Sequence, residues 1–207
     1  MKIIKPSVEI LTPIDKDFVY KHLESCGRVC YKSEDKTTET SAEDFLRRVI
    51  KRNHGAVLEH FSVTVKFICD RGITHEIVRH RIASFCQEST RYCRYDSGKF
   101  GNEITVIEPC YLTPGTETYA YWQAACQAAE DYYLKMSEAG CSPQEARAVL
   151  PTSVKTELVM TANIREWRHF FQLRTSPAAH PQMIEVAKML LEKFKEALPV
   201  LFEDINP

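Results

Sequence analysis

The stretch FSVTVKF, residues 61–67, decides the predicted fold class. Its apolar side chains alternate with polar ones, and a period of two is typical of a β-strand with one buried face. The same alternation recurs over residues 154–160. Because these strands are mixed with helices and no regular strand–helix–strand rhythm appears, the sequence predicts an α+β fold in one domain, residues 1–207. Helices are predicted over residues 15–31, 41–52, 74–81, 117–139, 163–174 and from 181 onward, and further strands over 2–11 and 104–107.

Several helix starts are marked by short polar side chains. Residues 142–145, SPQE, have the spacing of a capping box with proline at the first helical position, so a helix is predicted to cover Arg147. Ser41, Thr74 and Asn163 are predicted N-caps of the helices that follow them. The last helix has one apolar face, which consists of Met183, Val186, Ala187, Leu190, Leu191 and Phe194.

The charge of the chain is close to neutral. Its formal net charge is −1, which argues against a general nucleic-acid binder, because such proteins usually carry a basic excess. No apolar run approaches the roughly 18 residues of a membrane span, and the first residues lack the pattern of a signal peptide. The sequence therefore predicts a cytoplasmic protein that has no membrane partner.

The eight cysteines include no C-x-x-C pair. In a chain of this length without a secretory pattern, reduced thiols are the expected state. A zinc site formed by Cys26, Cys30 and nearby histidines is an alternative, but the usual spacing of zinc ligands is missing. We therefore predict no metal.

The stretch RHRIASFCQESTRY, residues 79–92, concentrates positive charge and hydroxyl groups. On the predicted helix, the side chains of the segment Arg79–Arg81 fan out about 100° apart, which suits an anion gripped from more than one side. The hydroxyl, backbone N–H and guanidinium groups of the segment Ser89–Arg91 form a second predicted anion site. A solvated basic loop is the alternative, but the interleaved apolar residues favour a partly buried site.

A second segment, NHGAVLEH, residues 53–60, has a carboxylate between two histidines. Glu59 could position a sugar hydroxyl or a ring nitrogen, and ordinary polar residues at a helix-to-strand junction are an equal alternative. Arg147, taken alone, would pass for a surface residue.

A third group lies on the helix that is predicted to begin after Asn163. Arg165 and His169 are four residues apart and share one face of this helix. Arg174 lies at its end, where an arginine often only complements the helix dipole. Trp167, Phe170 and Phe171 are predicted to face the core.

Taken together, these segments resemble the flavin-dependent thymidylate synthase family. The defining pattern of that family is R-H-R, seven residues and S, and Arg79-His80-Arg81 with Ser89 fit it. HGAVLEH matches the family's H-x-x-x-x-E-H, EARAVLP its R-x-x-L-P, and NIREWRHFFQLR followed by AAHPQ its C-terminal segment. The matches run in order from His54 to Gln182, which is most of the chain.

The resemblance implies a fold and a reaction. The implied fold is a single α+β domain with an antiparallel or mixed sheet flanked by helices, in a homotetramer that holds FAD between its subunits. The implied reaction moves a one-carbon unit from methylenetetrahydrofolate to carbon 5 of dUMP and gives dTMP. Reduction of the methylene to a methyl needs a hydride, which no side chain can supply. In this family the redox cofactor is FAD, and NADPH reduces it.

The resemblance also implies roles for single residues. FAD would contact His54, Ala56, Glu59, Arg79, His80, Arg81, Gln87, Asn163, Arg165 and His169. The substrate dUMP would contact Glu76, Arg79, Gln87, Ser89, Thr90, Arg91, Arg147 and Arg174. Arg174 is the implied catalytic residue, since its charge beside the uracil would stabilise negative charge on the N3/O4 side and activate carbon 5. Some family members differ from this chain at Ala56, Glu76, Cys86, Gln87 and His169, which affects individual contacts more than the function.

Two other functions are alternatives. Ser89 as a nucleophile would need a base, but none lies at adjacent or helical spacing, and no G-x-S-x-G pattern surrounds it. The pair Pro109-Cys110 is faintly similar to that of the flavin-free thymidylate synthases, whose other motifs are missing, so Cys110 is predicted to be a packed thiol. A nucleic-acid-binding module that uses the arginine cluster is opposed by the near-zero net charge and by the few aromatic residues among the arginines.

Overall fold

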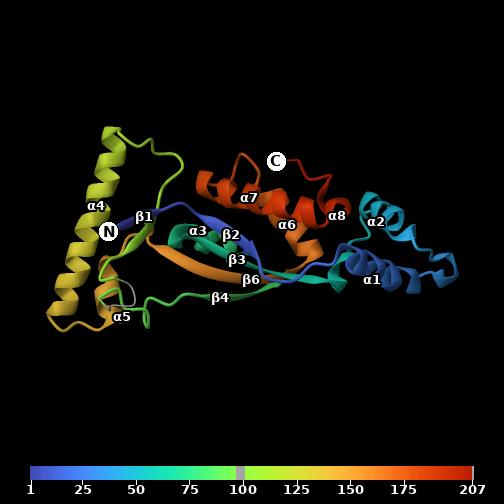
Figure 1. Ribbon diagram of the computed structural model, residues 1–207, viewed down its shortest axis with the longest axis horizontal. Coiled ribbons are helices and arrows are strands. Elements are labelled where there is room, and N and C mark those ends of the chain that lie inside the picture. The colour runs from blue at the N-terminus through green and yellow to red at the C-terminus, as the bar shows by residue number, and fades with distance from the viewer. Residues whose placement is uncertain (97–100, 207) are drawn as a thin grey trace. The chain divides into compact units, whose positions relative to one another are not determined.

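The computed structural model describes residues 1–96 and 101–206, and it confirms the predicted α+β class (Figure 1). The strands are β1 (Lys2–Ile4), β2 (Ser7–Ile10), β3 (Ser62–Asp70), β4 (Ala83–Gln87), β5 (Thr105–Ile107) and β6 (Lys155–Asn163). The α-helices are α1 (Lys16–Val29), α2 (Ser41–Lys51), α3 (Arg71–Ile77), α4 (Glu117–Glu138), α5 (Pro143–Ala146), α6 (Ile164–Arg174), α7 (Pro181–Ala197) and α8 (Pro199–Phe202). Short 3-10 turns are η1 (Glu34–Lys36), η2 (Gly55–His60) and η4 (Arg147–Val149).

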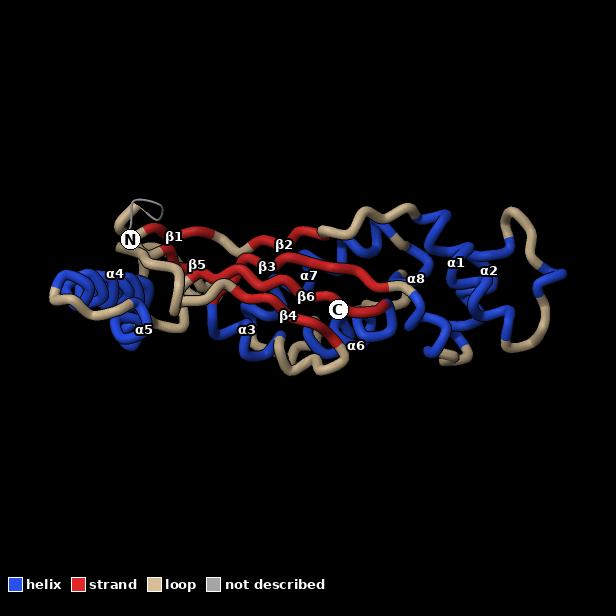
Figure 2. Tube along the Cα trace, turned by 90° about the horizontal axis from the view of Figure 1, so that it is seen from below, coloured by secondary structure: helices blue, strands red, loops and turns tan. Residues whose placement is uncertain are grey.

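Strands β2, β3, β6 and β4 form a four-stranded sheet in that order (Figure 2). Strands β3 and β6 are antiparallel, because Ile164 donates its N–H to the carbonyl of Phe61 while the hydroxyls of Thr64 and Thr161 meet 2.9 Å apart. Strands β1 and β5 form a separate parallel pair. The predicted antiparallel or mixed sheet is therefore confirmed.

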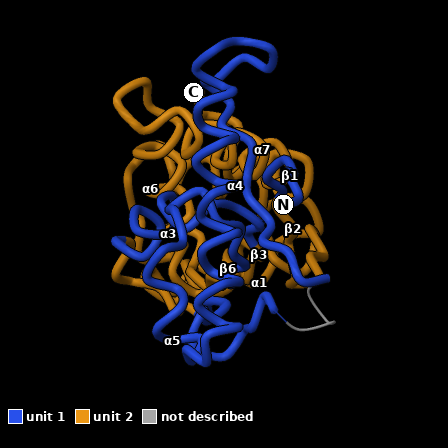
Figure 3. The backbone as a smooth tube through the Cα atoms, turned by 90° about the vertical axis from the view of Figure 1, so that its left-hand side faces the viewer, with its two compact units in different colours: residues 1–7, 67–79, 86–159 blue, residues 8–66, 80–85, 160–207 orange. Residues whose placement is uncertain are grey.

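The chain divides into two compact units (Figure 3). Unit 1 comprises residues 1–7, 67–79 and 86–159, and unit 2 comprises residues 8–66, 80–85 and 160–207. The long strands β3 and β6 each have residues in both units. The single domain 1–207 stays a prediction.

The core of unit 2 is rich in aromatic rings from α6, α7 and α8. Trp167, Phe170 and Phe171 are fully buried, as predicted, and Phe194 and Phe202 pack against them with ring centroids about 5–6 Å apart. All of the predicted apolar positions of the last helix are buried. This packing fixes α6, the helix that carries the predicted ligand-binding residues Arg165, His169 and Arg174.

The core of unit 1 is built around α4. Tyr133 and Cys126 of this helix pack with apolar side chains of β5 and of the segment before β6. Glu130, on the same helix, is buried and accepts a hydrogen bond from the backbone N–H of Ile104 over 2.7 Å. That bond links α4 to the start of β5, and the Met1 ammonium, 2.8 Å from Oε1, pairs the charge of the buried carboxylate.

Several predicted elements differ from those in the structure. The strand predicted over residues 2–11 is two strands, since Pro6 has no N–H to donate to a ladder. Strand β4 was not predicted, and it lies at the edge of the sheet with mostly exposed or half-buried side chains. Ser41 does not precede its helix as the cap. It is the first helical residue, and its hydroxyl donates to Glu24 of α1.

All eight cysteines are free, in agreement with the prediction of reduced thiols. Cys110 is exposed, so the prediction that its thiol is packed is wrong. Within the two described segments of the chain, no helix is both long enough and apolar enough to cross a lipid bilayer.

Candidate functional site

The segment Arg79–Arg81 lies in the loop between α3 and β4, not on a helix. Asp70 caps α3 by accepting the N–H of Ile73 over 2.9 Å, so the helix begins earlier than Thr74 and ends at Ile77. The predicted helical fan of these three residues is therefore wrong. In the loop, Arg79 and Arg81 are exposed, whereas the side chain of His80 is 2% exposed.

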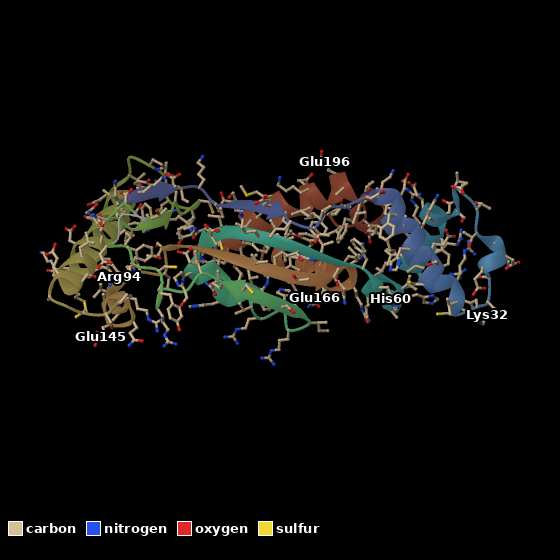
Figure 4. All side chains as sticks on the ribbon, turned by 60° about the horizontal axis from the view of Figure 1, so that its bottom comes forward. Lys32, His60, Arg94, Glu145, Glu166 and Glu196 are labelled. Carbon is tan, nitrogen blue, oxygen red and sulfur yellow. The ribbon has the colours of Figure 1, made fainter. Side chains whose placement is uncertain are left out.

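His80 lies at the centre of a buried polar cluster in unit 2. Its Nδ1 lies 2.8 Å from Oε1 of Glu166, and Nε of Arg174 donates to its Nε2 over 3.1 Å. The imidazole also contacts His169 and Phe170, with ring centroids 5.7 and 5.0 Å away. We call these five residues the His80 cluster. Glu166 lies in the first turn of α6, directly after β6 (Figure 4), and Arg174 ends the same helix.

The two hydrogen bonds decide the protonation of His80. A guanidinium has donors and no acceptor, so Nε2 must carry the lone pair that accepts from Arg174. The proton of the neutral ring is therefore on Nδ1, which donates to the carboxylate of Glu166. Burial lowers the pKa of His80, the hydrogen bond to Glu166 opposes this shift, and the charge of Arg174 adds to it. The imidazole is thus held neutral, in one tautomer.

A pocket of about 460 Å³ in unit 2 collects several of the predicted FAD-binding residues. Glu59, Asn163, Arg165 and His169 line it together with apolar side chains such as Ile82. The positions of Asn163 and Arg165 follow from the fold of α6. Asn163 is the predicted N-cap, and its side chain accepts the N–H of Glu166 over 2.9 Å, which caps the helix two residues before Arg165.

The guanidinium of Arg165 is positioned by two features of η2. Its Nη1 donates to Oε1 of Glu59 over 2.6 Å. A β-carbon at Gly55 would lie 2.8 Å from Nε of Arg165, so the arginine lies directly against the backbone of Gly55. Residue 55 therefore has to be small for Arg165 to take this position, and the guanidinium contributes charge to the wall of the larger pocket.

His54 and Ala56 line a different pocket of unit 2, about 360 Å³ in volume. Its other lining groups include Arg48 and Arg52, and Val49 of α2 lines both pockets. Turn η2 lines the larger pocket with Gly55, Leu58 and Glu59 and the smaller one with Ala56 and Val57. The structure therefore divides six of the predicted FAD-binding residues between two pockets, with His54 and Ala56 in the smaller one.

Unit 1 contains four predicted dUMP-binding residues after β4, which are Ser89, Thr90, Arg91 and Arg147. Nη1 of Arg147 donates to Oγ1 of the buried Thr90 over 3.2 Å, although the two residues are 57 positions apart. The hydroxyl of Ser89 accepts the N–H of Arg91 over 3.3 Å, and the carbonyl of Ser89 accepts the N–H of Tyr92. The structure thus brings Arg147 to the Ser89–Arg91 turn, and the binding of dUMP by these residues stays a prediction. Arg147 itself begins η4 and does not lie in α5.

Gln87 of unit 1 is oriented by two threonines. Its Nε2 donates to Oγ1 of Thr74 over 3.0 Å and to Oγ1 of Thr156 over 3.4 Å. The hydroxyl of Thr74 donates to the carbonyl of Arg71, so its oxygen is the acceptor for Gln87. Because the amide nitrogen is engaged, Oε1 of Gln87 is the atom that can accept a hydrogen bond from a ligand. Glu76, also in unit 1, lies on α3, and its carbonyl accepts the N–H of Arg79.

One group of potential metal ligands occurs in residues 1–96 and 101–206, and it consists of His80, Glu166 and His169. Both ring nitrogens of His80 are already engaged, and the nearby charge of Arg174 would repel a cation. The hydrogen-bonded relay here consists of Glu166, His80 and Arg174, and His169 adds a ring contact to His80. At the alternative zinc site, Cys26 meets only His22, with Sγ 3.9 Å from Nε2.

Sequence reasoning missed Glu166 and Gly55. Glu166 follows Asn163 at the spacing of a capping box, so its sequence position suggests a helix start and gives no sign of a partner 86 residues away. Gly55 lies next to a predicted binding residue, but only the approach of Arg165 shows why it is glycine.

Comparison with known proteins places the sequence in a family and matches the fold to a solved structure. The family model described as "Thymidylate synthase complementing protein" matches residues 19–200. The flavin-dependent thymidylate synthase of Pyrococcus furiosus is 33% identical over 182 residues, which cover 87% of this chain and 72% of that protein. The protein of the same name from Mycolicibacterium gilvum is 33% identical over 219 residues, covering 97% of this chain and 84% of that protein.

The chain therefore belongs to the flavin-dependent thymidylate synthase family, and the resemblance found in the sequence is confirmed. Its fold is also that of a solved structure, the UMP/dUMP methylase PolB from Streptomyces cacaoi bound with 5-Br dUMP. The two chains superimpose with a TM-score of 0.80 at 24% sequence identity, over 98% of this chain and 96% of PolB.

Proposed function

We propose that this protein is a thymidylate synthase that converts dUMP to dTMP with FAD as cofactor, methylenetetrahydrofolate as carbon donor and NADPH as reductant. Family membership over residues 19–200 supports this reaction. The observation that carries the proposal is the gathering of motif residues that are distant in sequence. Arg147 reaches Thr90 in unit 1, and His80 joins Arg174 in unit 2.

The chemistry of the larger pocket fits FAD. Arg165 offers charged donors for phosphate, and Asn163 and His169 offer polar groups for a sugar or a ring edge. Leu58 and Ile82 offer apolar surface for a planar ring system. When bound, the flavin would supply the hydride that reduces the transferred methylene to a methyl group.

The other proposed roles concern dUMP. The turn Ser89–Arg91, together with Arg147, would bind the phosphate through hydroxyl, backbone N–H and guanidinium donors. The oriented amide of Gln87 would present Oε1 as an acceptor to the nucleotide. Arg174, whose Nε is held by His80, would lie against the uracil and stabilise the negative charge that develops on it.

We also propose a homotetramer that holds FAD between subunits, in the cytoplasm. The side chain of Arg165 is 60% exposed, and Arg81 is exposed as well. An exposed arginine of one subunit is suited to bind a phosphate that a second subunit shields from solvent. The exposure of both arginines therefore supports a cofactor site at a subunit interface.

The reaction is tested with purified protein under anaerobic conditions. NADPH oxidation is followed with and without dUMP, and the products formed with methylenetetrahydrofolate are analysed for dTMP. Yellow protein that forms dTMP supports the proposal. Colourless protein that forms no dTMP with added FAD, and that shifts nucleic acid instead, would favour the nucleic-acid-binding alternative.

Ser89→Ala is expected to weaken dUMP binding about ten- to hundredfold and to leave measurable turnover. The reason is that one hydrogen bond to a charged phosphate typically contributes about 1.5–3 kcal/mol. Binding is measured by titration of the flavin absorption with dUMP, with Ser25→Ala on the exposed face of α1 as control. Loss of all turnover at unchanged dUMP affinity, or a covalent adduct on Ser89, would show that the serine is a nucleophile.

A further inference from the structure

Glu166 belongs to the His80 cluster, but the family motifs in this sequence assign it no role. Its side chain is 10% exposed, and Oε1 lies 2.8 Å from Nδ1 of His80. A buried carboxylate destabilises a protein unless it is hydrogen-bonded, so this contact is what makes the burial tolerable. The backbone of Glu166 has a separate function as the N–H that Asn163 caps. The side chain is therefore not needed to start α6.

We propose that Glu166 is a positioning residue for Arg174 and acts through His80. This inference rests on the proposed function, in which Arg174 contacts the uracil. The three groups form a chain in which the carboxylate accepts from Nδ1–H and Nε2 accepts from the guanidinium, over 2.8 and 3.1 Å. The carboxylate thereby selects the one tautomer that can bind Arg174.

The other tautomer of His80 is disfavoured because each ring nitrogen would then repel its partner. With the proton on Nε2, the ring would direct a donor at a guanidinium that has donors only. At the same time, the bare Nδ1 would face the negative carboxylate. Arg174 would then have no acceptor at this ring and would turn away, since its long side chain has several rotatable bonds. A charge that leaves the reacting ring no longer stabilises the transition state.

Glu166→Gln tests this directly. The amide keeps the size of the side chain but offers both a donor and an acceptor, so it can pair with either tautomer of His80. We expect kcat for dTMP formation to fall about tenfold or more, with a smaller change in KM for dUMP. We also expect the ¹⁵N resonances of the His80 ring to move from the pure Nδ1–H pattern towards a mixture of tautomers. The resonances are assigned by their absence in His80→Gln.

Glu203→Gln is the matched control. It also neutralises a carboxylate of unit 2 that pairs with an arginine, since Glu203, directly after α8, accepts from Arg47 over 3.1 Å. Its kcat and its His80 resonances should equal those of the wild type. Wild-type kcat in Glu166→Gln, or an unchanged Nδ1–H pattern, would overturn the positioning role.

The test separates this inference from the proposed function. The NMR measurement needs no turnover, so it reports on the relay even if the wild-type protein forms no dTMP, a result that would refute the reaction itself. If Glu166→Gln does not fold, Glu166→Asp replaces it. The shorter carboxylate lengthens the hydrogen bond, so kcat should fall at a near wild-type melting temperature. Unchanged kcat in Glu166→Asp would contradict the proposal.

Discussion

Arg174→Ala is expected to form dTMP at least about a hundredfold more slowly than the wild type while keeping its fold and its FAD. Removing one donor that stabilises charge in a transition state typically costs about 10²–10³ in rate. Arg174→Lys should be similarly slow. Lysine keeps the charge, but it lacks the planar fork with which Arg174 can donate from Nε to His80 and from its terminal nitrogens to a substrate. Single-turnover formation of dTMP, followed by chromatography, measures both effects.

A role of Arg174 in helix stability alone predicts a different result. If Arg174 only complements the dipole at the end of α6, lysine would serve as well, and alanine would cost at most about 1 kcal/mol of stability. Near wild-type dTMP formation by Arg174→Lys would then refute the catalytic role. Arg47→Ala, which removes an exposed guanidinium from α2, is the control for a nonspecific change of charge.

Arg165→Ala is expected to bind FAD at least about thirtyfold more weakly and to remain folded. Truncating one partner of a desolvated charge pair costs about 2–5 kcal/mol in binding. The fold should survive, because the pair of Arg165 with Glu59 is largely exposed, at 60% and 44%, and such pairs contribute little stability. Flavin content after purification, and the affinity of the apoprotein for added FAD, are the measurements. Arg47→Ala again serves as the matched control.

Full flavin content in Arg165→Ala would show that the larger pocket does not hold the phosphates. The smaller pocket beside η2, which has Arg48 and Arg52 in its lining, would then become the preferred location. Circular dichroism and the melting temperature distinguish a loss of binding from a loss of fold.

The sequence predicted those strands whose burial alternates. Val63, Val65 and Phe67 of β3 are fully buried while their neighbours are not, and this is the pattern that periodicity detects. Strand β4 has no such pattern, because an edge strand with exposed side chains on both faces has no apolar face to reveal it. The start of α3 was misplaced because Asp70 and Thr74 are both good caps, and only the structure shows which side chain accepts a helical N–H.

The sequence predicted site residues whose own side chain has the required chemistry. It did not predict residues whose role depends on pairing with a distant side chain. Charged and hydroxyl-bearing residues such as Arg147 and Ser89 were found from their type and their place in a motif. The pairing of Glu166 with His80 depends on tertiary structure, since 86 positions separate the two residues and neither has an unusual neighbour in sequence. The split of His54 from Glu59 into two pockets likewise follows from the turn of η2.

The absence of a side chain at Gly55 couples the choice of residue at position 55 to the position of the Arg165 side chain. A methyl group there would meet Nε, Cδ and Cζ of Arg165 within 2.8–3.2 Å, and the flexible arginine would move before the backbone did. A substitution at residue 55 would therefore spare the fold and redirect the charge. Positions 55 and 165 should consequently covary among relatives. A substitution at position 55 would also allow a protein engineer to move the guanidinium without replacing the arginine.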